Sequence, residues 1–243
     1  MGRHGKLEMG ENLAMATAYP ICLTVVFMGD SITFGQYVSS SLRWSDLIAD
    51  KVNVCYLDTP INFMFANRGV SGETTRQGLE RYPSDVQALC PDIMTLQFGL
   101  NDCNCWVTDR GLPRVSMAGY RANLVEMIVR ARYFSVKHLI LLTSHQTLRH
   151  KILPSGESLE TQRIHYNQIV RDVAQETGVT LCDIEAEFLK YSHKELASLL
   201  LPYPDVLHLS PLGHEVYANV VGPFINRAIA DIAKSSEHRH DQV

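Results

Sequence analysis

Short apolar runs alternate with longer amphipathic segments along this chain. The apolar runs have the lengths of buried β-strands and cover residues 21–29, 61–69, 92–99, 137–145 and 179–188. The first run, ICLTVVFMG, is continuously apolar and ends in glycine, which is typical of a strand buried on both faces. The segments between the runs predict helices over 41–52, 74–90, 117–134 and 159–178, with a last helix beginning near residue 210. This alternation predicts a five-stranded parallel sheet covered by helices on both faces.

The predicted helices carry signals for their boundaries. Gly178 is placed to end one helix, and Ser210 is placed to cap the last one. Pro83 predicts a break in its helix, and Pro223 predicts a kink or a second short helix near the C-terminus. One face of the helix at 117–134 is apolar and expected to be buried, through Tyr120, Leu124, Met127, Ile128 and Ala131.

Length and composition favour one domain. The 243 residues are 46% hydrophobic, which is enough for a single well-buried core. No repeat or linker-like change in composition divides the chain. We therefore expect one domain over residues 19–234, preceded by a flexible arm at 1–18 and followed by a polar tail at 235–243.

Charge and cysteine content narrow the class of protein. The chain has 22 basic and 26 acidic residues, for a net charge of −4. It has no block of basic residues, so we expect no nucleic-acid partner. No apolar run approaches the roughly 18 residues that span a bilayer, and the N-terminus lacks the apolar segment of a signal peptide. The six cysteines form neither a small disulfide framework nor CxxC zinc pairs. We expect a cytoplasmic protein with reduced thiols and no metal or cofactor.

Glycines and polar residues follow the predicted strands. GDSIT starts at Gly29 after the first run, GVSGETT starts at Gly69 after the second, and FGLND ends at Asp102 after the third. The segment DVLH, at 205–208, precedes the last helix. Ligand sites of parallel sheets lie beyond the carboxyl ends of the strands, so these segments are the candidates for a functional site.

These segments contain the groups that acyl transfer from an ester requires. Ser31 supplies a hydroxyl nucleophile, His208 a base to take its proton, and Asp205 a carboxylate to orient that base. The backbone N–H groups of Ser31 and Gly72 and the side-chain amide of Asn101 can act as oxyanion donors. A serine in a turn, a turn glycine and a helix-capping asparagine are the alternative interpretations of the same residues.

Taken in order, the four segments resemble the blocks of the SGNH hydrolase superfamily, the GDSL-type esterases and lipases. The residues that give the superfamily its name fall here on Ser31, Gly72, Asn101 and His208. The resemblance implies a three-layer α/β/α flavodoxin-like domain that hydrolyses an ester or thioester. It also implies that Ser31 is the nucleophile and His208 the general base, with Asp205 as its partner, and that Ser31, Gly72 and Asn101 form the oxyanion hole. The chain departs from the family name at Ile32, where the name has leucine.

Other polar residues near these segments admit two interpretations. His145 follows the fourth strand and is expected either to line the substrate pocket or to be a loop histidine with a structural hydrogen bond. Trp106 is expected either to form a pocket wall or to pack. Asp102 is expected to hold its loop, and His214 to lie on the helix surface or behind the base.

The predicted activity is that of a serine esterase acting through an acyl-enzyme on Ser31. Short-chain acyl or acetyl esters are the expected substrates, and the preference for a sugar or glycan as the alcohol rests on the breadth of the superfamily. Lysophospholipase, thioesterase or acyltransferase activity would use the same acyl-enzyme. A binding module that keeps the fold without catalysis is the alternative from another class. The sequence predicts no oligomeric state.

Overall fold

The strands form a single parallel sheet. The computed structural model describes residues 21–240, so the arm expected at 1–18 and the last residues of the expected tail, 241–243, lie outside the described residues. The strand order is β2-β1-β3-β4-β5, with β1 at Ile21–Gly29, β2 at Ile61–Gly69, β3 at Ile93–Gln97, β4 at His138–Leu142 and β5 at Thr180–Cys182. This is the flavodoxin-like order. The predicted fold class is confirmed.

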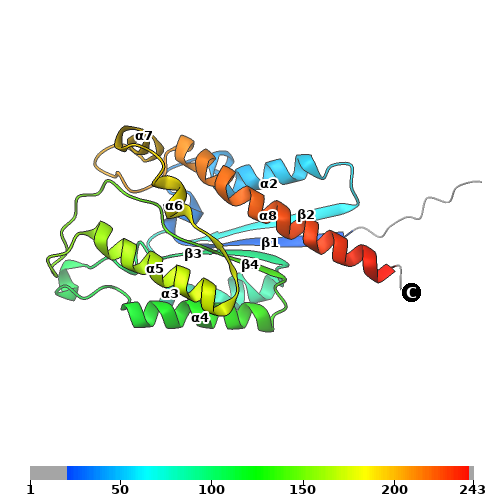
Figure 1. Ribbon diagram of the computed structural model, residues 1–243, viewed down its shortest axis with the longest axis horizontal. Helices are drawn as coiled ribbons and strands as arrows, with labels where there is room; N and C mark the ends of the chain where they lie inside the picture. Colours follow the sequence, from blue (N-terminus) through cyan, green and yellow to red (C-terminus); the bar gives the residue numbers. More distant parts are fainter. Residues whose placement is uncertain (1–20, 241–243) are drawn as a thin grey trace, which may run out of the picture.

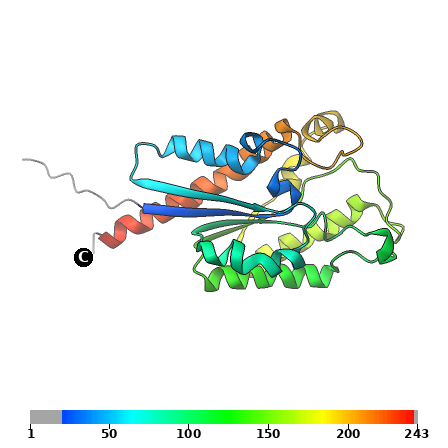
Figure 2. The same ribbon diagram turned by 180° about the vertical axis from the view of Figure 1, so that it is seen from behind.

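Helices cover both faces of this sheet (Figure 1). One face packs against α1 (Ser31–Phe34), α2 (Trp44–Cys55), α6 (Ile184–Phe188), α7 (His193–Leu199) and α8 (Pro211–His240). The other face packs against α3 (Thr75–Asp85), α4 (Met117–Tyr133) and α5 (Leu159–Thr177). Short 3₁₀ helices lie in the connections, as η1 (Ser40–Leu42), η2 (Gln87–Leu89) and η3 (Val107–Asp109). The two opposite views show that all strands point with their carboxyl ends toward the end of the molecule that holds α7 (Figure 1 and Figure 2).

The core is split into two apolar layers by the sheet. In β1, Leu23, Val25 and Phe27 face the layer that contains α2 and α8. Val26 and Met28 face the layer that contains α3, α4 and α5. Because successive side chains of a strand point to opposite faces, a strand buried on both sides is apolar at most positions. This explains the apolar run of β1, which Thr24 alone interrupts with a polar side chain.

The structure changes two expectations about prolines. Helix α3 continues two residues beyond Pro83 and ends at Asp85, so the proline lies in its last turn instead of breaking it. Helix α8 is a single helix through Pro223 to His240, so there is no second short helix, residues 235–240 of the expected tail are helical, and the kink stays a prediction. Its buried residues lie on both sides of the proline and include Tyr217, Val221, Ile225 and Ile229. Packing therefore holds together a helix that proline weakens.

The last strand is shorter than its apolar run. β5 ends at Cys182, and the Asp183 side chain accepts a hydrogen bond from the N–H of Ala186 to cap α6. The cap turns the second half of the predicted strand into a helix. No helix within residues 21–240 has both the length and the apolar character needed to cross a bilayer, and the cytoplasmic location stays a prediction.

Candidate active site

Ser31 lies at the carboxyl end of β1, at the first position of the short helix α1. The Asp30 side chain caps α1 by accepting a hydrogen bond from the N–H of Ile32 at 2.9 Å. A Cβ on Gly29 would lie 2.2 Å from Thr33 Oγ1 and 2.6 Å from the Gln97 carbonyl oxygen. Only glycine therefore allows the strand to turn so sharply into α1. This turn leaves Ser31 mostly buried, with its hydroxyl at the edge of the sheet.

His208 and Asp205 reach Ser31 from the loop before α8. His208 Nε2 lies 2.9 Å from Ser31 Oγ, and His208 Nδ1 lies 2.8 Å from Asp205 Oδ2. Asp205 Oδ1 accepts hydrogen bonds from the N–H groups of Leu207 and His208, at 3.0 and 2.7 Å. These contacts form a continuous hydrogen-bonded chain from the hydroxyl through the imidazole to the carboxylate, as a nucleophile, its base and an orienting group require.

The hydrogen bonds around Asp205 keep it ionised. Partial burial opposes its ionisation, but the hydrogen bonds from the backbone and ring of His208 outweigh burial and lower the pKa of the carboxyl. An ionised carboxylate accepts the Nδ1–H of His208, which leaves Nε2 free to accept the proton of the serine. The ring of Tyr37 packs edge-on against the His208 ring, with centroids 5.4 Å apart.

The predicted oxyanion donors line one cavity with the hydroxyl and the imidazole. The cavity measures about 170 Å³, and its walls include Ser31, Gly72, Asn101 and His208. Gly72 has φ +80°, a conformation that favours glycine, and its carbonyl accepts a hydrogen bond from Arg114 at 2.8 Å. In the described part of the chain, no hydrogen-bond acceptor lies within reach of the Gly72 N–H. The hydrogen-bonding capacity of this N–H is therefore not used by the described part of the protein.

No role was predicted from the sequence for the remaining wall residues, although three of them lie within the motif segments. They are Gln36, Ser71, Leu100, Asn104, Arg149 and Leu207. Arg149 also supports the base, because its Nε and Nη2 donate to the Asp205 carbonyl oxygen at 3.2 and 3.0 Å. The sequence around Arg149 is an ordinary polar loop. It indicates neither that Arg149 lines the cavity nor that it supports the loop of the base, so neither role was predicted.

Two buried carboxyls lie near the site. Burial raises the pKa of Asp30 to about 7 and that of Asp102 to about 6. Asp102 Oδ1 accepts from the N–H and hydroxyl of Thr75 at the start of α3. Asp102 therefore holds its loop, in line with the sequence-based expectation.

His145 does not line the cavity, which corrects the expectation that it contacts substrate. Its side chain is fully buried, and Nε2 donates to the Leu207 carbonyl oxygen at 2.8 Å. Burial lowers its pKa to about 3, so the ring stays neutral. His214 is also buried, with Nδ1 accepting from the N–H of Trp44 at 3.3 Å. His208 is thus the histidine that contacts Ser31.

Trp106 lies outside the walls of the cavity. Its ring is 57% exposed and stacks on the guanidinium of Arg114, with 4.5 Å between the guanidinium carbon and the ring centroid. Arg114 in turn binds the carbonyl of Gly72. The tryptophan is connected to the cavity through this arginine, and its contact with substrate stays a prediction.

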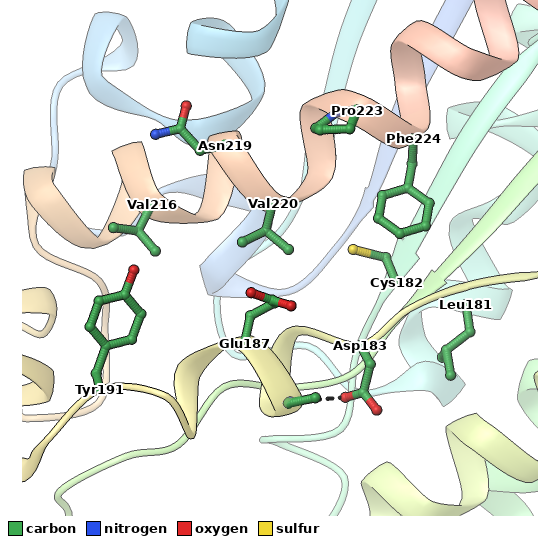
Figure 3. Close-up of a pocket in the computed structure, with 11 residues that line it drawn as sticks. Leu181, Cys182, Asp183, Glu187, Tyr191, Val216, Asn219, Val220, Pro223 and Phe224 are labelled. Atoms are coloured by element: carbon green, nitrogen blue, oxygen red, sulfur yellow. Dashed lines mark hydrogen bonds between the residues drawn. The ribbon is translucent and has the colours of Figure 1, made fainter.

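A larger hollow of about 550 Å³ lies elsewhere, between α6 and α8 (Figure 3). Its walls include Glu187 and Tyr191 on one side and Val216 and Val220 on the other. None of the residues predicted for catalysis lines it. The smaller cavity is the candidate active site because it holds the nucleophile, the base and the donors.

Comparison with known proteins gives consistent matches. The family model described as GDSL-like Lipase/Acylhydrolase family matches residues 27–216. An acetylxylan esterase of Geobacillus stearothermophilus is 26% identical over 211 residues, which are 80% of this chain and 90% of that protein. The uncharacterized lipoprotein YqeF of Bacillus subtilis is 27% identical over 77% of this chain and 85% of its own length. The isoamyl acetate-hydrolyzing esterase 1 homolog of Rattus norvegicus is 25% identical over 86% of this chain and 84% of its own length.

Solved structures share the fold. A crystal structure of the acetylxylan esterase from Geobacillus stearothermophilus aligns with a TM-score of 0.66 at 23% identity, covering 85% of this chain and 94% of that chain. At this level of identity the likeness shows the architecture alone.

Proposed function

The chain belongs to the GDSL-like lipase/acylhydrolase family and is a carboxylic ester hydrolase, and we propose that Ser31 is its nucleophile and a short-chain ester its substrate. The observation that carries the proposal is the hydrogen-bonded chain from Ser31 Oγ through His208 to Asp205, with distances of 2.9 and 2.8 Å.

Acylation begins when Ser31 Oγ attacks the ester carbonyl carbon. His208 Nε2 takes the hydroxyl proton as the oxygen–carbon bond forms, and Asp205 stabilises the resulting imidazolium. When the tetrahedral intermediate collapses, the bond to the alcohol oxygen breaks and His208 returns the proton to that oxygen. Water then attacks the acyl-enzyme by the same route, which releases the acid and restores the serine.

The oxyanion of each tetrahedral intermediate is proposed to bind three donors. They are the N–H groups of Ser31 and Gly72 and the side-chain amide of Asn101, all on residues of the cavity wall. Donors fixed beforehand favour the transition state because they need not reorganise as negative charge develops. The bond from Arg114 to the Gly72 carbonyl fixes the conformation of the loop that holds one of them.

The size and polarity of the cavity favour a small acyl group and a polar alcohol. Its volume of about 170 Å³ is below the roughly 300–1,000 Å³ of pockets that enclose whole ligands. Amides and a hydroxyl of Gln36, Ser71 and Asn104 can hydrogen-bond to the hydroxyls of a sugar. Together with the likeness to an acetylxylan esterase, these features support an acetyl ester of a sugar or glycan.

A substrate panel tests this proposal. We expect 4-nitrophenyl acetate to be hydrolysed with a higher kcat/KM than the butyrate, octanoate and palmitate, and acetylated sugars to release acetate. Ser31→Ala should lose nearly all turnover, by about 10⁴-fold or more, and a fluorophosphonate probe should label the wild type but not the variant. Near-normal rates in Ser31→Ala would refute the nucleophile. Transfer of the acetyl group to added sugars in preference to water would instead identify an acyltransferase.

A further inference from the structure

The walls of the active-site cavity carry positive charge in a protein that is acidic as a whole. The chain has a net charge of −4. Arg149 lines the cavity, whereas no aspartate or glutamate does. A charge of one sign beside a reaction centre selects substrates of the opposite sign.

Arg149 retains hydrogen-bonding capacity for a ligand. Its Nε and Nη2 donate to the Asp205 carbonyl oxygen, and its side chain is 35% exposed. A guanidinium carries five N–H donors, and no residue within 21–240 accepts from Nη1. The free edge of the fork suits two oxygens of a carboxylate or a phosphate.

Two further cations stand directly behind the wall. Arg114 donates to the Gly72 carbonyl, and Lys151 Nζ donates to Asn104 Oδ1 at 2.6 Å; both Gly72 and Asn104 line the cavity. Among the described residues, no carboxylate forms an ion pair with either cation within 4.0 Å. The charges of Asp102 and Asp109 act on Arg114 from farther away, whereas Lys151 donates to neutral oxygens of Asn104 and Cys105.

The nearest carboxylate is already engaged by the base. Asp205 Oδ1 binds two backbone N–H groups and Oδ2 binds His208 Nδ1, whereas Arg149 Nη2 lies 3.8 Å from Oδ2. Arg149 thus binds the carbonyl of Asp205 more closely than its carboxylate. Arg149 uses two of its N–H donors, on Nε and Nη2, to support the loop that carries the base. Its other N–H donors remain for a substrate.

We propose that the alcohol portion of the substrate carries an anionic oxyacid group, a carboxylate or a phosphate, that binds Arg149. A short acyl group has no place for this charge, so the charge belongs to the leaving alcohol. Arg114 and Lys151 draw the anion toward the cavity without contacting the reacting atoms. This inference rests on the proposed esterase function and adds the class of alcohol.

The test compares three acetyl esters that share the sugar ring and differ in the group at C6, which is neutral, a carboxylate or a phosphate. Methyl glucoside, methyl glucuronide and methyl glucoside 6-phosphate, each acetylated at the same hydroxyl, are assayed for kcat/KM with wild type, Arg149→Gln and Arg149→Lys. We expect the wild type to prefer at least one charged ester by about ten-fold or more. The preference should shrink as NaCl rises from roughly 0.01 to 0.5 M. Arg149→Gln should abolish it, and Arg149→Lys should keep part of it.

A distant charge change provides the control. Arg130→Gln removes a cation that pairs with Glu126 on the surface of α4, and it should leave the preference unchanged. If Arg149→Gln does not fold, Lys151→Gln and the salt dependence of the wild type decide, with a reduced preference expected in both.

Each outcome bears on a different claim. Equal use of all three esters by the wild type, or an equal loss on all three in Arg149→Gln, would overturn the anion site and leave Arg149 as a positioning residue. The charged ester that is preferred identifies the anion as carboxylate or phosphate. Failure to hydrolyse every ester, 4-nitrophenyl acetate included, would count against the proposed function itself.

Discussion

The loop that carries the nucleophile and the loop that carries the base are built in different ways. At the end of β1, Asp30 caps Ile32, and the N–H groups of Phe34 and Gly35 bond to the carbonyls of Asp30 and Ser31. All these hydrogen bonds join residues at most four positions apart. The same turn also receives long-range donors, because Trp44 Nε1 donates to the Ile32 carbonyl and Asn67 Nδ2 donates to the Thr33 carbonyl. Short-range hydrogen bonds therefore shape the turn at Ser31, and tertiary contacts anchor it.

The loop before α8 depends on residues far away in the sequence. Its carbonyls at Asp205, Val206 and Leu207 accept hydrogen bonds from Arg149, Leu148 and His145 respectively. Val206 has φ +45°, a left-handed conformation that costs free energy in a β-branched residue. The contacts from the segment after β4 hold this strained backbone. The comparison indicates that tertiary contacts anchor both loops, and that in the loop of the base they also hold a strained backbone at Val206.

The largest effect is expected from Asp205→Asn, in the second loop. The amide can still accept from the two backbone N–H groups, but it does not stabilise an imidazolium as a carboxylate does. The corresponding exchange in a serine protease lowers kcat about 10⁴-fold, and we expect a similar loss of kcat on 4-nitrophenyl acetate.

Asp109→Asn is the matched control for that exchange. Asp109 lies on the loop beside Trp106, whose N–H it caps, and does not contact the base. Its variant should keep near-normal kcat. A kcat of Asp205→Asn within ten-fold of wild type would remove Asp205 from the proposed mechanism.

The short-range signals in both loops explain what the sequence predicted. The apolar runs predicted the strands and their order along the chain, since a strand buried on both faces is mostly apolar. The four motif segments, of which DVLH is the last, contain the residues that line one cavity in the structure. Each of these signals lies within a few neighbouring positions.

Features that depend on tertiary contact escaped sequence reasoning. Arg149 and His145 act on a loop about sixty positions downstream, and no local pattern announces such a contact. The same reason explains helix α8, which is one helix where Pro223 predicted a kink or a second short helix, because residues on both sides of the proline are buried. The pocket role expected for His145 was wrong because its ring is buried and donates to the Leu207 carbonyl, a contact that its position after the strand does not reveal.

A smaller effect is expected from His145→Leu. This exchange removes the donor to the Leu207 carbonyl, which leaves a buried acceptor unpaired at a cost of about 1–3 kcal/mol. Because Leu207 adjoins the base, we expect kcat to fall about ten-fold with little change in KM. His145→Gln restores an N–H donor and should recover most of the kcat.

His214→Leu separates this effect from general destabilisation. His214 is also buried and bonds to the backbone of Trp44, outside the loop of the base. It should lower the stability while the folded enzyme keeps its kcat. Equal losses of kcat in the two leucine variants would show that His145 has no special connection to the base.

The smallest effect on kcat is expected in the first loop, where the change acts on stability instead of catalysis. Burial, reinforced by the charge of Asp102, raises the pKa of Asp30 from 3.8 to about 7. Between these values the folded state binds more protons than the unfolded state, so this group makes the free energy of unfolding fall as pH rises from about 4 to about 7. Above pH 7 its contribution is constant.

Asp30→Asn removes this titration and keeps an oxygen that can accept from the N–H of Ile32. Urea unfolding at pH 4 to 8 should therefore show that the variant gains stability relative to the wild type as pH rises, with the gain complete near pH 8. Asp50→Asn, on the exposed face of α2, should follow the wild-type curve. Parallel curves for wild type and Asp30→Asn would mean that Asp30 has the same pKa in the folded and the unfolded state. Asp30 would then cap the start of α1 as an ionised carboxylate, and burial would not raise its pKa.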